Sequence, residues 1–142
     1  MPSFAVQLPN LQVMGPLVDI RVLVGLPVEQ ALQKAGTTVP PPVAVKAMID
    51  TGASGSVIDP NTAKQLGLQP VGVVNIATPS SASVSCPQYV VRLLFPNNVV
   101  IQAIAIEAPM QGQQIQCLIG RDVPALGVLV YTGYLNQFSF SL

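Results

Sequence analysis

The stretch that decides the fold is MIDTGASGSVIDP, residues 48–60. Two apolar residues lead directly into Asp50, and the chain then turns through Thr51, Gly52 and Ala53. This order places a carboxylate at the end of a strand, where a loop supported by a rigid sheet can present it. Gly52 permits a backbone conformation or a close approach that a side chain would forbid. Taken alone, the Asp-Thr-Gly triplet is equally compatible with an aspartate in an ordinary turn.

Length and composition restrict the classes of protein that this chain can be. With 142 residues, it is expected to fold as a single domain, residues 1–142, around one core. Six basic and six acidic residues balance, and no basic cluster occurs, so we expect no nucleic-acid partner. Only 8% of residues are charged while 50% are hydrophobic, which indicates that the chain assembles with other copies.

Membrane and secretory signals are not evident in the sequence. The longest uncharged run, residues 65–91, contains three prolines and a serine-rich middle, so it cannot form a membrane-spanning helix. The first ten residues, MPSFAVQLPN, lack the basic patch and apolar block of a secretory signal. We therefore expect no membrane partner for these residues and a cytoplasmic location.

The chain contains no histidine, which removes several kinds of catalysis at once. Serine and cysteine nucleophiles usually take their base from imidazole, and most catalytic zinc sites use it as a ligand. The sequence thus predicts carboxylate chemistry without a metal or cofactor. Cys86 and Cys117 lie in apolar, strand-like contexts, which favours buried free thiols over a disulfide or a reactive thiol.

Period-two alternation predicts strands on both sides of an insertion that precedes Asp50. Apolar residues alternate over 18–24, and VAVKAMI at 43–49 is a second strand. Between them, PVEQALQKAG at 27–36 has helical spacing but is also compatible with a loop. Three prolines at 40–42 then indicate an extended connector. The insertion either borders a substrate cleft or decorates an edge of the fold.

The rest of the chain is predicted to be largely β. Asp59 followed by Pro60 is a helix start, and Gly67 would end that helix after about two turns. Asp122 is expected to cap a short helix over 123–126. Further strands are expected at 4–8, 71–76, 84–95, 99–108, 115–120, 128–131 and 138–142, with turns at 78–83, 97–98 and 132–133.

The motifs and their order resemble the retropepsin-like aspartic proteases, the family of the retroviral proteases and their bacterial relatives. The resemblance covers most of residues 43–142. It consists of the Asp-Thr-Gly-Ala turn at Asp50, a hairpin at the place of the family's flap, and LIGRD at 118–122 about 65 residues after the turn. It implies an all-β, closed-barrel fold with one or two short helices and half of an active site per chain.

The resemblance also implies the chemistry. Asp50 from each of two chains would form the catalytic pair of a homodimeric endopeptidase that cleaves internal bonds of a peptide or protein substrate. Two carboxylates that share a site cannot both ionise cheaply, so the pair holds one proton over a range of pH. Thr51 would hydrogen-bond across the two-fold axis, Gly52 would offer its backbone to substrate, and Ala53 completes the turn.

The flap and the Gly-Arg-Asp segment are the other site elements that the resemblance implies. The hairpin tip would close over an extended peptide, with the contacts falling on Thr78, Pro79, Ser80, Ser81 and Ala82. A tip with proline and without glycine is expected to be stiffer than the Gly-rich retroviral tip.

Gly120, Arg121 and Asp122 would support the site structurally. Retroviral enzymes commonly carry an acidic residue at the position of Ser54, where it pairs with the later arginine. Arg121 therefore needs another partner, for which Asp59 is a candidate.

Two other functions remain open at this stage. The first is a catalytically inactive dimerisation or peptide-binding module with the same fold, which Ser54 and the altered tip favour modestly. The intact Asp-Thr-Gly turn argues against it, because a buried carboxylate pair costs stability. The second is a β-barrel carrier of a small molecule, although aromatic residues make up only 5% of the chain. The family also suggests that the terminal strands, 4–8 and 138–142, interleave between subunits.

Overall fold

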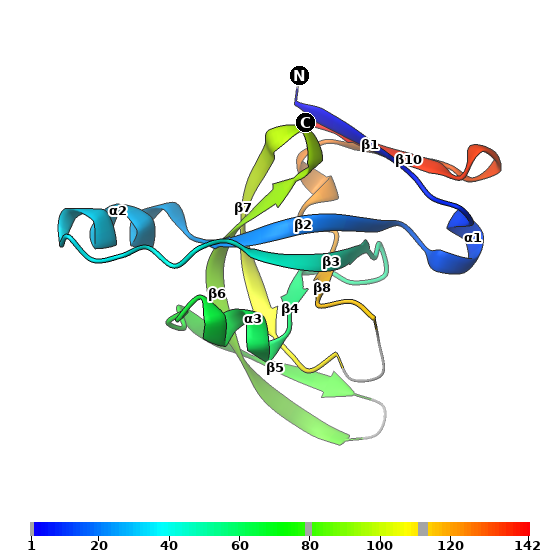
Figure 1. Cartoon of the computed structure of the whole chain (residues 1–142). Coiled ribbons are helices and arrows are strands. Elements are labelled where there is room, and N and C mark those ends of the chain that lie inside the picture. Colours follow the sequence, from blue (N-terminus) through cyan, green and yellow to red (C-terminus); the bar gives the residue numbers. More distant parts are fainter. Residues whose placement is uncertain (1, 79–80, 111–113) are drawn as a thin grey trace.

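The computed structural model describes residues 2–78, 81–110 and 114–142, which form two β-sheets and a few short helices (Figure 1). The strands are β1 (Ser3–Gln7), β2 (Leu17–Val24), β3 (Val43–Ile49), β4 (Val57–Ile58), β5 (Gly72–Thr78), β6 (Ser81–Phe95), β7 (Val99–Glu107), β8 (Cys117–Ile119), β9 (Val128–Thr132) and β10 (Gln137–Ser141). The α-helices are α1 (Leu11–Met14), α2 (Leu26–Lys34) and α3 (Pro60–Gln65), and short 3₁₀ helices span Pro96–Asn98, Pro124–Leu126 and Gly133–Leu135.

The larger sheet has the strand order β2-β3-β8-β4-β7-β6-β5, and a further pairing of β2 with β6 closes six of these strands into a barrel. A closed ring leaves no edge strand among its members. The expected all-β closed barrel with few short helices is therefore confirmed.

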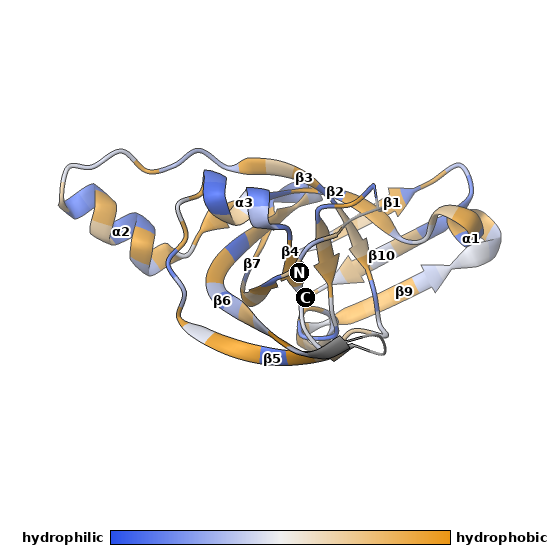
Figure 2. Cartoon of the chain, turned by 90° about the horizontal axis from the view of Figure 1, so that it is seen from below, coloured by the Kyte–Doolittle hydropathy of each residue, from blue (hydrophilic) through white to orange (hydrophobic). Residues whose placement is uncertain are grey.

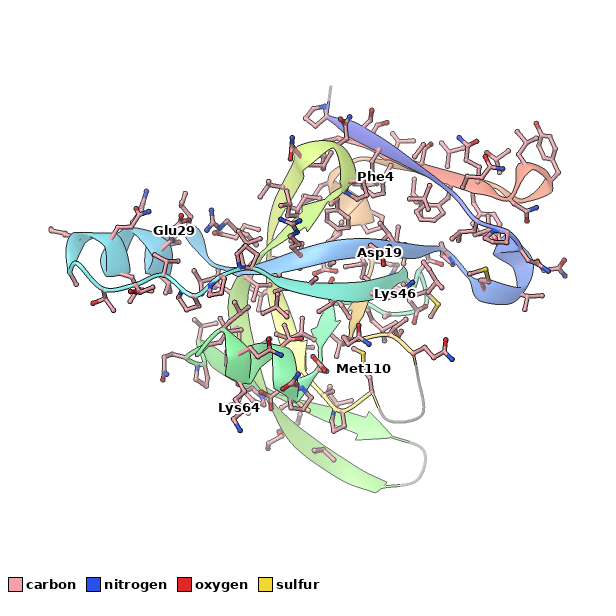
Figure 3. All side chains as sticks on the ribbon, in the orientation of Figure 1. Phe4, Asp19, Glu29, Lys46, Lys64 and Met110 are labelled. Atoms are coloured by element: carbon pink, nitrogen blue, oxygen red, sulfur yellow. The ribbon has the colours of Figure 1, made fainter. Side chains whose placement is uncertain are left out.

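The period-two pattern of the sequence determines which side chains form the barrel core. Along β2 the side chains of Val18, Ile20 and Val22 are buried, while the intervening Asp19 and Arg21 are exposed. On the solvent side, Asp19 lies 3.6 Å from Lys46 of β3, and the two side chains are labelled near each other in Figure 3. Strand β2 runs antiparallel to β3. The two buried faces meet inside the barrel because successive side chains alternate between faces of a strand.

The smaller sheet joins the two ends of the chain, with the strand order β1-β10-β9. Its inner face carries Phe4, Phe138 and Phe140, all buried. The ring of Phe4 stacks on that of Phe95 from β6, with centroids 5.2 Å apart, so aromatic packing attaches this sheet to the barrel. The segments 4–8 and 138–142 are thus core strands, as expected. In this structure they pair with each other within one chain.

Helix α2 and the proline connector form an arm that extends away from the barrel (Figures 1 and 2). No α2 side chain is buried. The arm leaves from the end of β2 near Val24, whereas Asp50 follows the opposite end of this strand pair, where Leu17 faces Met48. Of the two predicted roles, the structure supports decoration of an edge.

Two predicted helix caps have clear outcomes. Asp59 caps α3, its carboxylate accepting a hydrogen bond from the Thr62 N–H at 3.1 Å. The prediction that Asp122 caps a helix over 123–126 is wrong: a 3₁₀ turn spans Pro124–Leu126 without a side-chain cap, and Asp122 accepts a hydrogen bond from Ser56 instead. Helix α1 had no counterpart in the sequence prediction. Within the described part of the chain, no helix is long and apolar enough to span a bilayer.

Candidate active site

Asp50 stands directly after β3, where the sheet fixes its backbone. Its N–H donates to the carbonyl of Ile119 in β8 at 2.8 Å, and its own carbonyl accepts from the Ala53 N–H at 3.1 Å. One carboxylate oxygen, Oδ1, accepts a hydrogen bond from the Gly52 N–H at 2.9 Å. The half-buried carboxylate is therefore held in one orientation by the turn that follows it.

Arg121 secures the same turn from the neighbouring segment. Its backbone N–H donates to the Ala53 carbonyl at 2.8 Å, and its Nη1 donates to the Thr51 carbonyl at 2.7 Å. Asp59 is not the partner of Arg121, because its carboxylate is engaged at the start of α3. In this chain the guanidinium of Arg121 pairs with the backbone carbonyl of Thr51, in place of a carboxylate at position 54.

One close backbone approach and a buried hydroxyl hold the turn against the end of β8. A Cβ atom added at Gly120 would lie 2.3 Å from the Gly55 carbonyl oxygen, so only glycine fits there. The buried hydroxyl of Ser56 donates to Asp122 Oδ1 at 2.9 Å and accepts from the Gly120 N–H at 3.1 Å. Sequence reasoning missed Ser56, for which the signal is its place directly before the apolar residues Val57 and Ile58 of β4.

A cavity of about 440 Å³ opens beside the carboxylate. It is lined by Pro16, Met48, Ile49, Asp50, Thr51, Leu129 and Tyr131. Most of these side chains are apolar, and they come from the segment before β2, from β3 and from β9. The contribution of β9 was not predicted, because it depends on how the terminal sheet packs against the barrel.

The hairpin of β5 and β6 is the predicted flap. Strand β5 pairs antiparallel with β6, and the register of the pairing shifts between Ile76 and Thr78. Thr78 ends β5, and Ser81 and Ala82 begin β6, with Thr78 opposite Ser81. Pro79 and Ser80 lie outside the described residues. The structure therefore contains the hairpin, and its role as a lid stays a prediction.

The thiols do not compete with Asp50 as catalytic groups. Cys86 and Cys117 are both free and buried. Burial, with added repulsion from Asp122 and Asp59, raises the pKa of Cys117 to about 12, so its thiol stays neutral.

Burial, with a hydrogen bond to Glu107, also raises the pKa of Tyr89. In the described ranges no three His, Cys, Asp or Glu residues gather as metal ligands.

Comparison with known proteins identifies the arrangement. The chain matches no curated protein sequence, but residues 41–123 match a family model described as aspartyl protease. A retropepsin-like aspartic protease from Rickettsia conorii has a similar structure, with a TM-score of 0.54 and 12% identity over 98% of this chain and 92% of that one. The simian foamy virus (mac) protease has a TM-score of 0.49 and 16% identity over 78% and 93% of the two chains.

The matched region contains both the Asp50 turn and the Gly-Arg-Asp segment that holds it. It spans more than half of the chain, and the closed barrel agrees with the fold of the Rickettsia structure. This chain therefore belongs to the aspartyl protease family, with a retropepsin-like fold.

Proposed function

We propose that this protein is an aspartic endopeptidase that hydrolyses internal peptide bonds of a peptide or protein substrate as a homodimer. The observation that carries the proposal is the fixed carboxylate of Asp50, which accepts the Gly52 N–H at 2.9 Å beside a cavity of about 440 Å³. The backbone and the side chain of Arg121 both hydrogen-bond to the turn, and this double support favours a functional role over a simple connection between strands.

One chain supplies only half of the machinery for this reaction. The sequence has a single Asp-Thr-Gly turn, and aspartic peptidase chemistry needs one carboxylate as base and one carboxyl as acid. A second copy would bring its own Asp50 to the first. The pair would share one proton, because two adjacent negative charges repel each other.

The proposed reaction proceeds in two steps. The ionised carboxylate takes a proton from water while the water oxygen bonds to the scissile carbonyl carbon, and the protonated partner gives its proton to the carbonyl oxygen. In the second step the carbon–nitrogen bond breaks. The leaving nitrogen takes the proton acquired from water, and a hydroxyl of the intermediate returns a proton to the other carboxylate. The pair regains its single proton.

The other residues of the site would hold the two turns and the substrate. Thr51 would hydrogen-bond across the two-fold axis, and Ala53 would form the floor. Because the Gly52 N–H is engaged by Asp50, the proposed backbone contact to substrate falls to the Gly52 carbonyl. The hairpin tip, from Thr78 to Ala82, would close over a peptide bound as an added strand.

Digestion of a mixed peptide library tests this function. Native protein is expected to cut it, while Asp50→Asn should cut about 10²-fold to 10⁴-fold more slowly, the usual worth of acid–base catalysis, and should keep the native circular dichroism. Asp19→Asn is the matched control, since that carboxylate is exposed on the outside of the barrel. Equal cutting by Asp50→Asn would overturn the proposal, and peptide retention without products would support the inactive binding module.

A further inference from the structure

The outer strand of the terminal sheet, β9, is left with one free edge. We propose that β9 of one chain pairs antiparallel with β9 of a second copy about a two-fold axis at Val130. The result is a continuous sheet of order β1-β10-β9-β9-β10-β1, in which each chain keeps its own terminal strands. This inference rests on the proposed homodimeric function and specifies the surface that assembles it.

Two hydrogen bonds at the ends of β10 determine which backbone N–H and C=O groups of β9 point toward its free edge. Leu8 N–H donates to the Asn136 carbonyl, and Leu142 N–H donates to the Pro2 carbonyl, both at 2.9 Å. In an antiparallel ladder the hydrogen-bonded pairs alternate, so even-numbered residues of β10 bond toward β1 and odd-numbered ones toward β9.

The register carries this alternation into β9. Ser139 of β10 lies opposite Val130, so Val130 bonds toward β10, and the N–H and C=O groups of Leu129 and Tyr131 point away from the sheet. In the described part of the chain, no backbone or side-chain partner is recorded for these four groups.

The outward N–H and C=O groups of Leu129 and Tyr131 can pair with the same groups of a second chain. An antiparallel pairing centred on Val130 sets Leu129 opposite Tyr131 of the second copy and Tyr131 opposite Leu129. Each of these two pairs exchanges two hydrogen bonds, and Val130 meets its counterpart at the non-bonded position between them. All five residues of the strand then have partners.

The other edge of the terminal sheet is less open. By the same alternation, the backbone groups of Ser3 point away from β10, and the Ser3 carbonyl accepts a hydrogen bond from Asn97 Nδ2 at 2.9 Å. The segment Pro96–Asn98 thus covers part of the β1 edge. Covering an edge with another segment is a common protection against pairing, and no hydrogen bond from the residues that the structure describes covers the outer edge of β9 in this way.

The position of β9 connects this edge to catalysis. Leu129 and Tyr131 line the same cavity as Asp50 and Thr51. A two-fold axis through Val130, perpendicular to the joined sheet, would therefore place the Asp50 cavities of both chains on the same face of that sheet.

The composition of the strand suits self-association. Val128, Val130 and Tyr131 are 59%, 46% and 52% exposed, and β9 contains no charged residue. Pairing would bury this apolar surface without bringing like charges together.

Charge reversal across the axis tests the pairing. Val130→Lys and Val130→Glu, each alone, should weaken dimerisation at least tenfold in sedimentation, because the two substituted side chains face each other. An equimolar mixture of both variants should recover dimers and peptide cleavage. Val128→Lys is the matched control, since it lies on the same exposed face but opposite Thr132 of the second copy. Dimers of undiminished strength in Val130→Lys and Val130→Glu would overturn the proposal.

Disulfide trapping tests the assembly independently of catalysis. Val130→Cys should form a disulfide-linked dimer under mild oxidation, also in an Asp50→Asn background that cannot cut peptides. Ala5→Cys with Ser139→Cys, opposite each other in the β1–β10 register, should link within one chain. Linkage of this pair between chains would mean exchanged termini and overturn the inference. Trapped Val130→Cys dimers without any cleavage by the native protein would leave the assembly correct and the proposed function wrong.

Discussion

Arg121 Nη1 donates a hydrogen bond of 2.7 Å to the backbone carbonyl of Thr51, the residue that follows the catalytic candidate. While the guanidinium of Arg121 donates to the Thr51 carbonyl, the backbone N–H of the same residue donates to the Ala53 carbonyl. The arginine therefore acts on the path of the chain through the turn. This explains how the turn is secured without an acidic residue at position 54.

Arg121→Ala is expected to reduce kcat for peptide cleavage about tenfold with little change in KM, because the carboxylate loses its fixed orientation while the cleft remains. The free energy of unfolding should fall by less than about 1 kcal/mol, since the side chain is exposed. Kinetics and thermal unfolding measure the two effects. Arg21→Ala, at an exposed position of β2, is the control, and an unchanged kcat in Arg121→Ala would contradict the positioning role.

Gly120→Ala is expected to destabilise the protein by about 1–3 kcal/mol or more, because the new Cβ would overlap backbone atoms. Those atoms are the carbonyl oxygen and carbon of Gly55, at 2.3 and 2.4 Å. Gly55→Ala is the matched control, since its nearest atom would be Ile106 Cδ1 at 4.0 Å. Chemical denaturation of both variants gives the comparison. Equal stability of the two would mean that the chain relaxes around residue 120 more easily than the packing indicates.

Ser56→Ala should cost about 1–3 kcal/mol, because it leaves the buried Gly120 N–H without an acceptor. Removing Asp122, the acceptor of the Ser56 hydroxyl, should be partly redundant with this change. In a double-mutant cycle with Asp122→Ala, the two losses of unfolding free energy should therefore sum to more than the loss in the double variant. Strict additivity would show that the hydroxyl and the carboxylate do not act as a unit.

The strands and the position of the Asp50 turn could be predicted from the sequence because both depend on local patterns, whereas the closed barrel was predicted only through the family resemblance, since its closure needs the long-range pairing of β2 with β6. Period-two alternation identifies β2 and β3 without knowledge of their partners. Asp122 was misassigned for a different reason: as a potential cap it has a local use, and only the folded chain brings Ser56, 66 residues away in sequence, to its carboxylate. The contribution of Leu129 and Tyr131 to the Asp50 cavity is likewise a result of long-range packing.

Removal of the α2 arm should leave cleavage intact. We expect that replacing residues 26–38 with Asn-Gly changes the free energy of unfolding by about 1 kcal/mol or less, because no α2 side chain is buried, Val39 keeps its packing against the core, and loop shortening costs little. The change removes Glu29, the ion-pair partner of Arg92, but Arg92 Nε keeps its hydrogen bond to the Val24 carbonyl. Peptide kinetics and denaturation measure the result, and a large rise in KM would show that the arm borders the cleft.

The buried thiol of Cys117 makes stability depend on alkaline pH. Its pKa is raised from 9.0 to about 12 in the folded chain, by burial first and then by Asp122 and Asp59. Between these values the unfolded chain has lost the thiol proton and the folded chain has kept it. The free energy of unfolding therefore falls as pH rises through this window, and the full contribution is present below pH 9.

Denaturation at pH 8, 9 and 10 should show this loss, which we expect to reach about 1 kcal/mol at pH 10. Cys117→Ala should be less stable at pH 8, since a buried side chain is shortened, but it should lack this part of the alkaline slope. The comparison stops at pH 10 because Tyr89, whose pKa is also raised above 10.0, adds a slope of the same sign at higher pH. Parallel curves for the native chain and Cys117→Ala would mean that the thiol loses its proton equally easily in both states.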